Sequence, residues 1–440
     1  MANTFLTKTF ASDSNRKTWT WSAWIKRSGL GGTQTLMTQV DGWNGNGNAG
    51  FYIVGDQLTS YNFTSSLNAG TDSYNRPSMF LRDVNGWYHI VVRLDTTQST
   101  ASDRCRWYVN GEQLTDFAYA NYPSLNQDCN FNGGDPHGIG SHTAGANYFD
   151  GVMSYINFSD GYSYAPTVFG STDSTTGEWT INTNPTFTLG THGFTILKNG
   201  NTITDQSTNS NNWSLGGGTL TNTLDCPANV FATWNPLSAL STPPTFSNGN
   251  TTAAVPTSGG AFRSTLAASS GKYYCEVKVT SLNNAAVGIQ PIDSAYNVSI
   301  FGDTSGIGLY GTNGEVYKNG SNIGAVASVS NNDIIGMAID LDNNNIYFSV
   351  NGQYASGLSG SWNQSFGSAY AVAINSGHAY TIAGVNGSSG TTSNISINFG
   401  NGTFGTSAVT SAGTPGSTPG TFEYDVPSGY EPLTTKGLNA

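Results

Sequence analysis

Charged side chains are scarce in this sequence. Of its 440 residues only 10% are Asp, Glu, Lys or Arg, whereas an ordinary soluble domain has roughly 25%. Lys, Glu and Arg are also good helix formers at exposed positions, so their scarcity argues against a helix-rich protein. Aromatic residues make up 12% of the chain and provide large apolar side chains to bury, unlike the composition of a disordered protein. The composition therefore predicts a folded chain with little helix.

Basic residues, long apolar runs and paired cysteines are also few or missing. The 16 Lys and Arg residues stand against 27 Asp and Glu, a net charge of −11, so we expect no nucleic-acid partner. No apolar run reaches the roughly 18 residues of a membrane span, and residues 1–17 lack the basic-then-apolar order of a secretory signal. The cysteines are too scattered for a disulfide framework and form no C-x-x-C zinc motif. We expect buried thiols at Cys105, Cys129, Cys226 and Cys275.

Short alternating segments separated by Gly and Asn turns fill most of the chain. From Trp19 to Ile25 every second side chain is apolar and shares one face of an extended strand. The pair Asn110-Gly111 is typical of a tight hairpin turn. Trp19, Trp21, Trp87 and Trp107 are predicted to lie in the core. Many short strands at this spacing predict an all-β protein built of antiparallel β-sandwiches.

Changes in pattern divide the chain into four parts. Residues 1–165 and 245–404 are the two regions rich in strand patterns. Between them, residues 166–244 are more polar and irregular, and we expect a connector with some β structure, at 194–197 and 220–224. Residues 405–440 begin as a Ser, Gly and Pro-rich linker. They end in a tail whose apolar residues are expected to dock onto a sheet.

The first region resembles a laminin-G-like, concanavalin A-like sandwich. The motifs that carry the resemblance occur in the family's order: the first core strand at 21–26, the W-x-H strand at 86–91, the YVNG hairpin at 107–111 and the closing F-x-G strand at 149–156. The sequence departs from the family at Tyr155, where many members have glutamate. The resemblance implies one concanavalin A-like sandwich over residues 1–165.

The second region resembles a SPRY domain, which is also a concanavalin A-like sandwich. Residues 271–277 stand where that family usually shows Y-W-E-V. Residues 333–342 and 346–352 fit its central hairpin, and 397–400 fit its end. The fold class expected for the whole chain is therefore two concanavalin A-like antiparallel β-sandwiches joined by a connector.

The order of these parts resembles virion proteins of tailed bacteriophages. A segment at 169–177 and the V-P-S-G-Y ending at 426–430 belong to that resemblance. It implies a structural protein of a tail fibre or surface appendage, made in the host cytoplasm and located in the virion. Its partners would be other virion proteins, further copies of itself, with a trimer favoured, and a host-surface glycan. The alternatives are a capsid-surface decoration or fibre without a receptor role, and a carbohydrate-binding module of a cellular protein.

Catalytic motifs are missing from the sequence. Concanavalin-like glycan hydrolases typically show E-x-D-x-x-E, which provides two carboxylates about 5–9 Å apart, and neither it nor G-x-S-x-G occurs. Asp340 and Asp342 flank a hairpin turn, where turn chemistry explains them. His89 is expected to be a core histidine bonded to backbone, and the glycines between His137 and His142 argue against a helical metal pair. We predict no catalytic residue and a protein that is not an enzyme.

Sugar binding is the function that the loops favour. Lectin-type sites combine an exposed aromatic platform with a few placed polar groups. The loop at 41–48 carries Trp43 between small polar residues, with Asn44 and Asn46 beside it. A second candidate is Tyr74, Asn75 and Arg76. The alternative for Trp43 is packing under its own loop or at a subunit contact.

A cofactor is not expected. Residues 340–344 resemble the start of a calcium loop but lack its glycine and distal glutamate. Calcium held by loop oxygens of the first region is the alternative, with Asp41, Asp56 and Asp135 as its acids.

Overall fold

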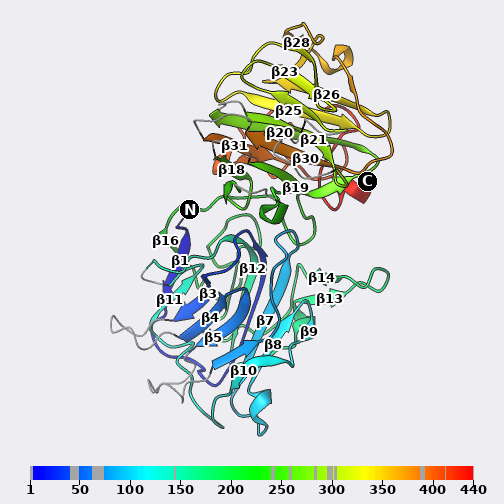
Figure 1. Cartoon of the computed structure of the whole chain (residues 1–440). Helices are drawn as coiled ribbons and strands as arrows, with labels where there is room; N and C mark the ends of the chain where they lie inside the picture. Colours follow the sequence, from blue (N-terminus) through cyan, green and yellow to red (C-terminus); the bar gives the residue numbers. More distant parts are fainter. Residues whose placement is uncertain are drawn as a thin grey trace. The chain divides into compact units, whose positions relative to one another are not determined.

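The chain folds into two compact units, unit 1 (Met1–Asn222) and unit 2 (Thr223–Ala440) (Figure 1). The computed structural model describes residues 3–39, 49–61, 74–142, 145–238, 243–256, 260–281, 285–294, 301, 305–386, 392–411 and 413–439. Over these ranges both units are built of β-strands with short 3-10 turns and without α-helix. The turns are η1 (Ala101–Asp103), η2 (Pro166–Val168), η3 (Pro236–Ser238), η5 (Phe366–Ser368) and η6 (Gly437–Asn439). No helix in the described part is long and apolar enough to cross a membrane. The all-β prediction is confirmed.

Unit 1 is a sandwich of two six-stranded sheets. The first has the order β16-β1-β11-β3-β4-β5, with β16 (Ser214–Gly217), β1 (Phe5–Thr9), β11 (Pro136–Ile139), β3 (Thr33–Gln39), β4 (Ala49–Val54) and β5 (Gln57–Tyr61). The second has the order β15-β12-β2-β7-β8-β9, with β15 (Phe194–Ile196), β12 (Gly151–Asp160), β2 (Thr18–Arg27), β7 (Tyr88–Asp95), β8 (Cys105–Val109) and β9 (Glu112–Gln113). Two short pairs complete the unit: β6 (Tyr74–Pro77) with β10 (Phe117–Asn121), and β13 (Gly170–Thr172) with β14 (Trp179–Ile181).

Strand β2 lies at the centre of the unit 1 core. Its alternating apolar side chains from Trp19 to Ile25 are all fully buried among residues of both sheets. Trp87 and Trp107 are buried as well. The core that the alternation predicts is therefore confirmed.

The chain that follows β12 covers the outer face of the β2–β7–β8 sheet. Trp179 of β14 donates from Nε1 to Nδ1 of His89 at 2.9 Å, and Nε2 of His89 lies 2.9 Å from Oγ of Ser22. An imidazole that accepts at Nδ1 carries its proton on Nε2, so His89 donates to Ser22. Burial lowers the pKa of His89 to about 3, which keeps the ring neutral at pH 7. His89 is buried as predicted, but these two partners are side chains.

Trp179→Phe is expected to lower the unfolding free energy of unit 1 by about 1–3 kcal/mol, the cost of a buried acceptor without its donor. Phenylalanine fills much of the indole's space but cannot donate to His89. Chemical denaturation of the full chain measures the change. Trp362→Phe is the matched control, because the Trp362 indole donates to the Ala327 carbonyl at an exposed site. An equal effect of both substitutions would contradict this role of Trp179.

The expected connector 166–244 divides between the two units. Contacts place residues 166–222 with unit 1 and residues 223–244 with unit 2. Strand β15 forms at the predicted position and pairs with β12. Residues 220–224 form no strand, and that prediction is wrong: Leu220 is partly buried against the core of unit 1, whereas Leu224 is exposed.

Unit 2 is a second sandwich. Its larger sheet follows the order β17-β18-β31-β20-β25-β26-β27-β28, with β29 paired to β26 and β34 to β20. Its strands are β17 (Thr245–Ser247), β18 (Thr252–Val255), β20 (Lys272–Ser281), β25 (Ile334–Asp340), β26 (Asn345–Val350), β27 (Gln353–Ala355), β28 (Trp362–Gln364), β29 (Val372–Ala373), β31 (Ser393–Asn398) and β34 (Glu431–Pro432). The smaller sheet has the order β19-β30-β21-β22-β23-β24, with β19 (Ala261–Ala268), β30 (Tyr380–Asn386), β21 (Ala285–Pro291), β22 (Ile307–Tyr310), β23 (Glu315–Lys318) and β24 (Ser321–Ala325). A short pair, β32 (Thr403–Phe404) with β33 (Ser407–Ala408), follows β31.

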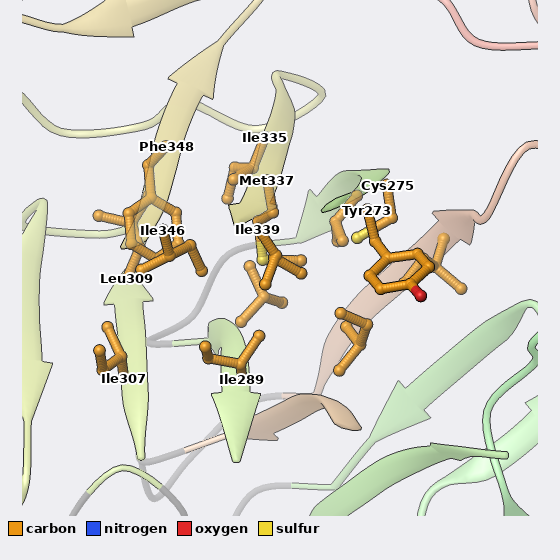
Figure 2. Close-up of a cluster of buried hydrophobic side chains, with 14 of the residues drawn as sticks. Tyr273, Cys275, Ile289, Ile307, Leu309, Ile335, Met337, Ile339, Ile346 and Phe348 are labelled. Atoms are coloured by element: carbon orange, nitrogen blue, oxygen red, sulfur yellow. The ribbon is translucent and has the colours of Figure 1, made fainter. Parts of the chain in front are cut away.

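The unit 2 core lies between these two sheets. Alternating side chains of β25, such as Ile335 and Met337, meet Ile289 of β21 and Leu309 of β22 in one buried cluster (Figure 2). The alternation of apolar and other residues that predicts strands in this region also identifies the residues that are buried. The two-sandwich fold class is confirmed.

The C-terminal tail docks on the outer face of the larger sheet. The buried carboxylate of Glu276 in β20 accepts the backbone N–H groups of Glu423 and Tyr424, each at 2.8 Å. Phe422 and Tyr430 are buried there with Tyr274 of β20. Docking of the apolar tail residues occurs as predicted.

All four cysteines are free thiols, and Cys105, Cys129 and Cys275 are buried, whereas Cys226 is half-buried. Burial raises the pKa of all four thiols, that of Cys105 to about 12. Thiols of this kind are poor nucleophiles and poor metal ligands at pH 7. The predicted burial is confirmed for three of them.

Candidate functional site

Four tyrosines form a chain of ring contacts on unit 1, which we call the tyrosine cluster: Tyr52, Tyr61, Tyr74 and Tyr119. The ring centroids of Tyr52 and Tyr61 are 5.5 Å apart, those of Tyr61 and Tyr74 are 5.0 Å apart, and those of Tyr74 and Tyr119 are 4.8 Å apart. Aromatic pairs at these distances attract one another beyond the effect of their burial. The rings therefore form one continuous aromatic surface.

Strand register brings these four side chains together. In the β4–β5 pair, Tyr52 is opposite Thr59, so Tyr61 lies two residues further along the same face. In the β6–β10 pair, Tyr119 is opposite Arg76 and Asn121 is opposite Tyr74, which puts the two tyrosines on a diagonal. Diagonal neighbours are within reach of aromatic side chains. The cluster therefore depends on pairings between segments that are distant in sequence.

The tyrosine cluster is buried at one end and open at the other. Tyr52 is only 6% exposed, whereas Tyr61 and Tyr119 are 38% and 47% exposed. Burial raises the pKa of the Tyr52 phenol, and burial together with Tyr74 raises that of Tyr61. These two hydroxyls therefore stay protonated at pH 7, and hydroxyls of this kind both donate and accept hydrogen bonds.

Arg76 and Asn75 lie on opposite faces of β6. Arg76 donates from Nη2 to the Val54 carbonyl at 3.1 Å and acts on the pKa of Tyr61, so its charge lies beside the cluster. Asn75 is fully buried, and its backbone N–H donates to Oγ of Ser60 at 3.1 Å. Tyr74 and Arg76 of the predicted second site are thus brought to the aromatic surface. The Asn75 side chain is turned inward, because adjacent residues of a strand point to opposite faces.

The other predicted glycan loop cannot be placed. Trp43, Asn44, Asn46 and Asp41 lie outside the described residues.

The remaining calcium candidates have other partners. Asp56 forms ion pairs with the buried Arg27 at 3.0 Å and with Arg82 at 3.2 Å, and it accepts the Gly31 N–H at 2.6 Å. Asp135 accepts a hydrogen bond from the Gln39 amide at 3.2 Å. Across the described ranges, no group of three or more His, Cys, Asp or Glu residues is arranged to hold a metal ion. In the structure Asp56 is the counter-ion of Arg27, which is otherwise enclosed by protein.

The histidines at 137 and 142 differ in their surroundings. His137 is buried, contacts Phe10 and Phe131 edge-on, and lies with Nδ1 2.8 Å from the Asp135 carbonyl. Burial lowers its pKa to about 3. His142 is half-buried in a bridge to Ala146. The structure places His137 in the core rather than at a surface metal site.

Three members of the tyrosine cluster are missing from the sequence-based site. Tyr52 stands in a predicted strand, but its neighbours in sequence do not show that further tyrosines lie beside it. Tyr61 and Tyr119 are separated in sequence by more than fifty residues, so only the strand order brings them near Tyr74. The alternation at 50–54 was the one available signal, since it assigns Tyr52 and Phe51 to opposite faces.

A protein family matches the sequence of unit 1. The Laminin_G_3 family, described as the concanavalin A-like lectin/glucanases superfamily, matches residues 3–168. Residues 3–168 are therefore similar to concanavalin A-like domains, which agrees with the resemblance that the motifs in this region carry. No curated protein matches the chain.

Solved structures similar to the chain include two SPRY domains and a sugar-related protein. The SPRY domain of human HERC1 is 16% identical, with a TM-score of 0.30, over 37% of this chain and 96% of that one. The TRIM65 PSpry domain is 15% identical, with a TM-score of 0.30, over 38% and 91%. A candidate carbohydrate-binding protein from Bacteroides ovatus is 17% identical, with a TM-score of 0.31, over 52% and 62%. Scores of this size identify no ligand.

Proposed function

We propose that this chain is a structural, glycan-binding protein of a tailed-phage virion, part of a tail fibre or surface appendage, and that unit 1 binds host-surface glycan on the tyrosine cluster. The observation that carries the glycan proposal is the row of contacting, mutually tilted rings that reaches the surface at Tyr61 and Tyr119, with the charge of Arg76 beside it. The lectin-type family assignment of unit 1 fits a carbohydrate-binding role. Binding there requires no bond cleavage.

A sugar ring has an apolar C–H face and a rim of hydroxyls, and the tyrosine cluster with Arg76 offers a group suited to each. The C–H face packs on the exposed phenol rings, while guanidinium and phenol hydroxyls bond to the rim. An open platform of this kind gives weak binding for each site. Several copies in one particle raise the overall affinity for the glycan surface, because each further contact forms at high effective concentration. A trimer, the assembly we favour, supplies that multiplicity.

Tyr119→Ala is expected to weaken glycan retention about tenfold, since loss of one aromatic contact is worth about 1.5 kcal/mol. A glycan array with the purified full chain measures the change. Tyr162→Ala is the matched control, because Tyr162 is 44% exposed and stacks on Tyr164, not on a member of the cluster. Equal retention by Tyr119→Ala and the parent would remove the cluster from the site.

The virion proposal is supported by the order of the sequence motifs and by the charge-poor surface. A particle that meets varied salt gains little from surface ion pairs, because salt screens them. Labelled antibody on intact particles tests the location. Label on the tail or an appendage is expected, and label confined to the capsid would favour the alternative of a decoration protein without a receptor role.

A further inference from the structure

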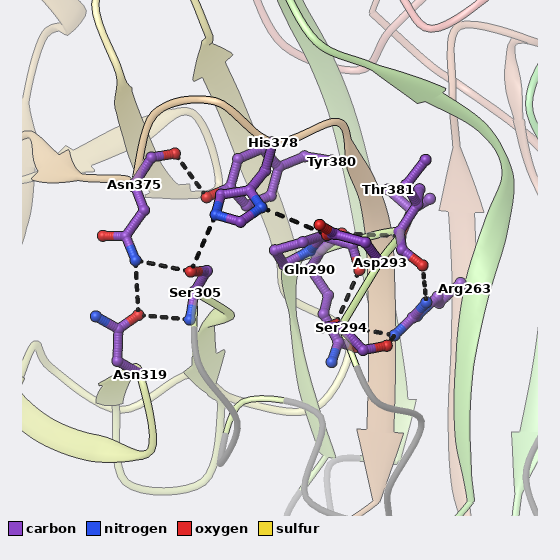
Figure 3. Close-up of polar contacts among 12 residues, drawn as sticks. Arg263, Gln290, Asp293, Ser294, Ser305, Asn319, Asn375, His378, Tyr380 and Thr381 are labelled. Atoms are coloured by element: carbon purple, nitrogen blue, oxygen red, sulfur yellow. Dashed lines mark hydrogen bonds and ion pairs between the residues drawn. The ribbon is translucent and has the colours of Figure 1, made fainter.

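Polar side chains gather at one end of the smaller sheet of unit 2. They come from four neighbouring strand ends: Asp293 follows β21, Ser305 precedes β22, Asn319 follows β23, and Asn375 and His378 precede β30 (Figure 3). We call these five residues the end cluster. Strands β30, β21, β22 and β23 are consecutive in the sheet, so antiparallel pairing brings these strand ends to one edge.

A serine, a histidine and an aspartate form a relay within the end cluster. Oγ of Ser305 lies 3.5 Å from Nε2 of His378, and Nδ1 of His378 lies 3.4 Å from Oδ1 of Asp293. The pairing with Asp293 favours the tautomer protonated at Nδ1, which leaves Nε2 free to accept the serine proton. In hydrolytic sites such contacts are often long until substrate is bound.

Two asparagines hold Ser305 in place. Its backbone N–H donates to Oδ1 of Asn319 at 2.8 Å, and Nδ2 of Asn375 donates to its Oγ at 2.8 Å. Because Asn375 occupies an acceptor position of the hydroxyl, the serine proton is left to point elsewhere, and His378 is beside it. Ser305 also has a φ of +74°, a backbone conformation that non-glycine residues rarely adopt and that is concentrated at functional sites.

The relay opens to solvent on one side. The Ser305 residue is 7% exposed, whereas the side chains of His378 and Asp293 are 31% and 67% exposed. The base is therefore exposed to solvent, and the hydroxyl lies directly behind it.

In departure from the prediction from the sequence that there is no catalytic residue, we propose that Ser305 is a nucleophile for carboxylic esters, with His378 as its general base and Asp293 as the residue that positions His378. Ser305 Oγ bonds to the acyl carbon and its proton passes to Nε2 of His378. The bond to the alcohol oxygen then breaks, and that oxygen takes the proton. Water repeats the sequence on the acyl-serine and releases the acid, so ester and water give acid and alcohol. Asn375, which donates to Oγ of Ser305 at 2.8 Å, holds the attacking oxygen in position.

This activity is independent of glycan binding by unit 1 and is tested on the full chain with p-nitrophenyl acetate. Hydrolysis above buffer is expected, with a loss of at least about 100-fold in Ser305→Ala and in His378→Gln. Asp293→Asn is expected to lower kcat and leave KM unchanged, since Asp293 acts through His378. Ser294→Ala is the matched control, because Ser294 bonds to Arg263 and the Pro291 carbonyl in the same region.

A fluorophosphonate probe gives a readout that does not depend on a variant folding. It should modify Ser305 of the parent chain, as mapped by mass spectrometry, and heat-unfolded chain should not react. The absence of label on Ser305, or equal hydrolysis by folded Ser305→Ala and Ser294→Ala, would overturn the proposal.

Discussion

Asp160→Ala is expected to destabilise unit 1 by about 3–5 kcal/mol, because it leaves several buried donors without their acceptor, at about 1–3 kcal/mol for each. The Asp160 residue is 3% exposed, and its carboxylate accepts five hydrogen bonds. The donors are Oγ of Ser14 at 2.5 Å, the N–H of Asn15 at 3.1 Å, Nδ2 of Asn132 at 2.6 Å, and the N–H groups of Thr191 and His192 at 3.0 Å each. One carboxylate thus joins the N-terminal segment, a loop of the sandwich and the chain after β14.

The measurement is urea unfolding of the full chain followed by tryptophan fluorescence. Since a domain of ordinary stability has only about 5–15 kcal/mol in total, unit 1 of this variant should unfold at a much lower urea concentration. Asp128→Ala is the control, because Asp128 is exposed and its ion pair with Lys17 is long, at 3.9 Å. Asp160→Asn should also destabilise, because its amide presents a donor to groups that donate. Parent-like unfolding of both Asp160 variants would refute the network.

The second large effect is a fall in the stability of unit 2 as the pH rises from about 5 to 8. Burial raises the pKa of Glu276 to about 7, against the hydrogen bonds from Glu423 and Tyr424, which act to lower it. The ordinary value is 4.5, so between these values the folded chain binds the proton more tightly than the unfolded chain. The stabilising contribution is therefore full below pH 4.5 and lost by about pH 7. It amounts to about 3 kcal/mol at most, at 1.36 kcal/mol for each pKa unit.

Glu276→Gln isolates this contribution from the other titrating groups. The difference in unfolding free energy between parent and variant should change by up to about 3 kcal/mol between pH 5 and pH 8, in the direction of a weaker parent at high pH. Asp340 and Glu423 have lowered pKa values, so their titration changes the stability of unit 2 at lower pH. Hydrogen exchange of residues 422–432 should report the loosening of the tail at high pH. A difference that is constant with pH would contradict the raised pKa.

Much of the architecture could be predicted from the sequence because strand burial follows a period of two. The apolar positions from Trp19 to Ile25 are core positions, and the motifs at 86–91 and 149–156 become β7 and β12. The segment after β12 could not be predicted in the same way. Its strands are short, and polar side chains such as Asp205 and Asn211 bond to backbone there, which replaces a regular strand pattern by irregular contacts.

The sites depend on pairings that local pattern does not contain. Tyr74 and Arg76 could be chosen from their types, but Tyr61 and Tyr119 join them only through strand register. Ser305 lies in no nucleophile motif, and its contact with His378 follows from the order of β21, β22 and β30 in the sheet. Asn75 could be chosen from its residue type but lies in the interior, since one step along a strand turns a side chain from surface to interior.

The proposed role in glycan binding is tested most directly by oxidative footprinting of the full chain with and without the glycan that it retains on an array. Bound glycan should protect peptides containing Tyr61, Tyr74 and Tyr119, and the peptide of Tyr162 should be modified equally in both samples. Protection that leaves the tyrosine cluster unchanged, or falls on other surfaces alone, would contradict the account.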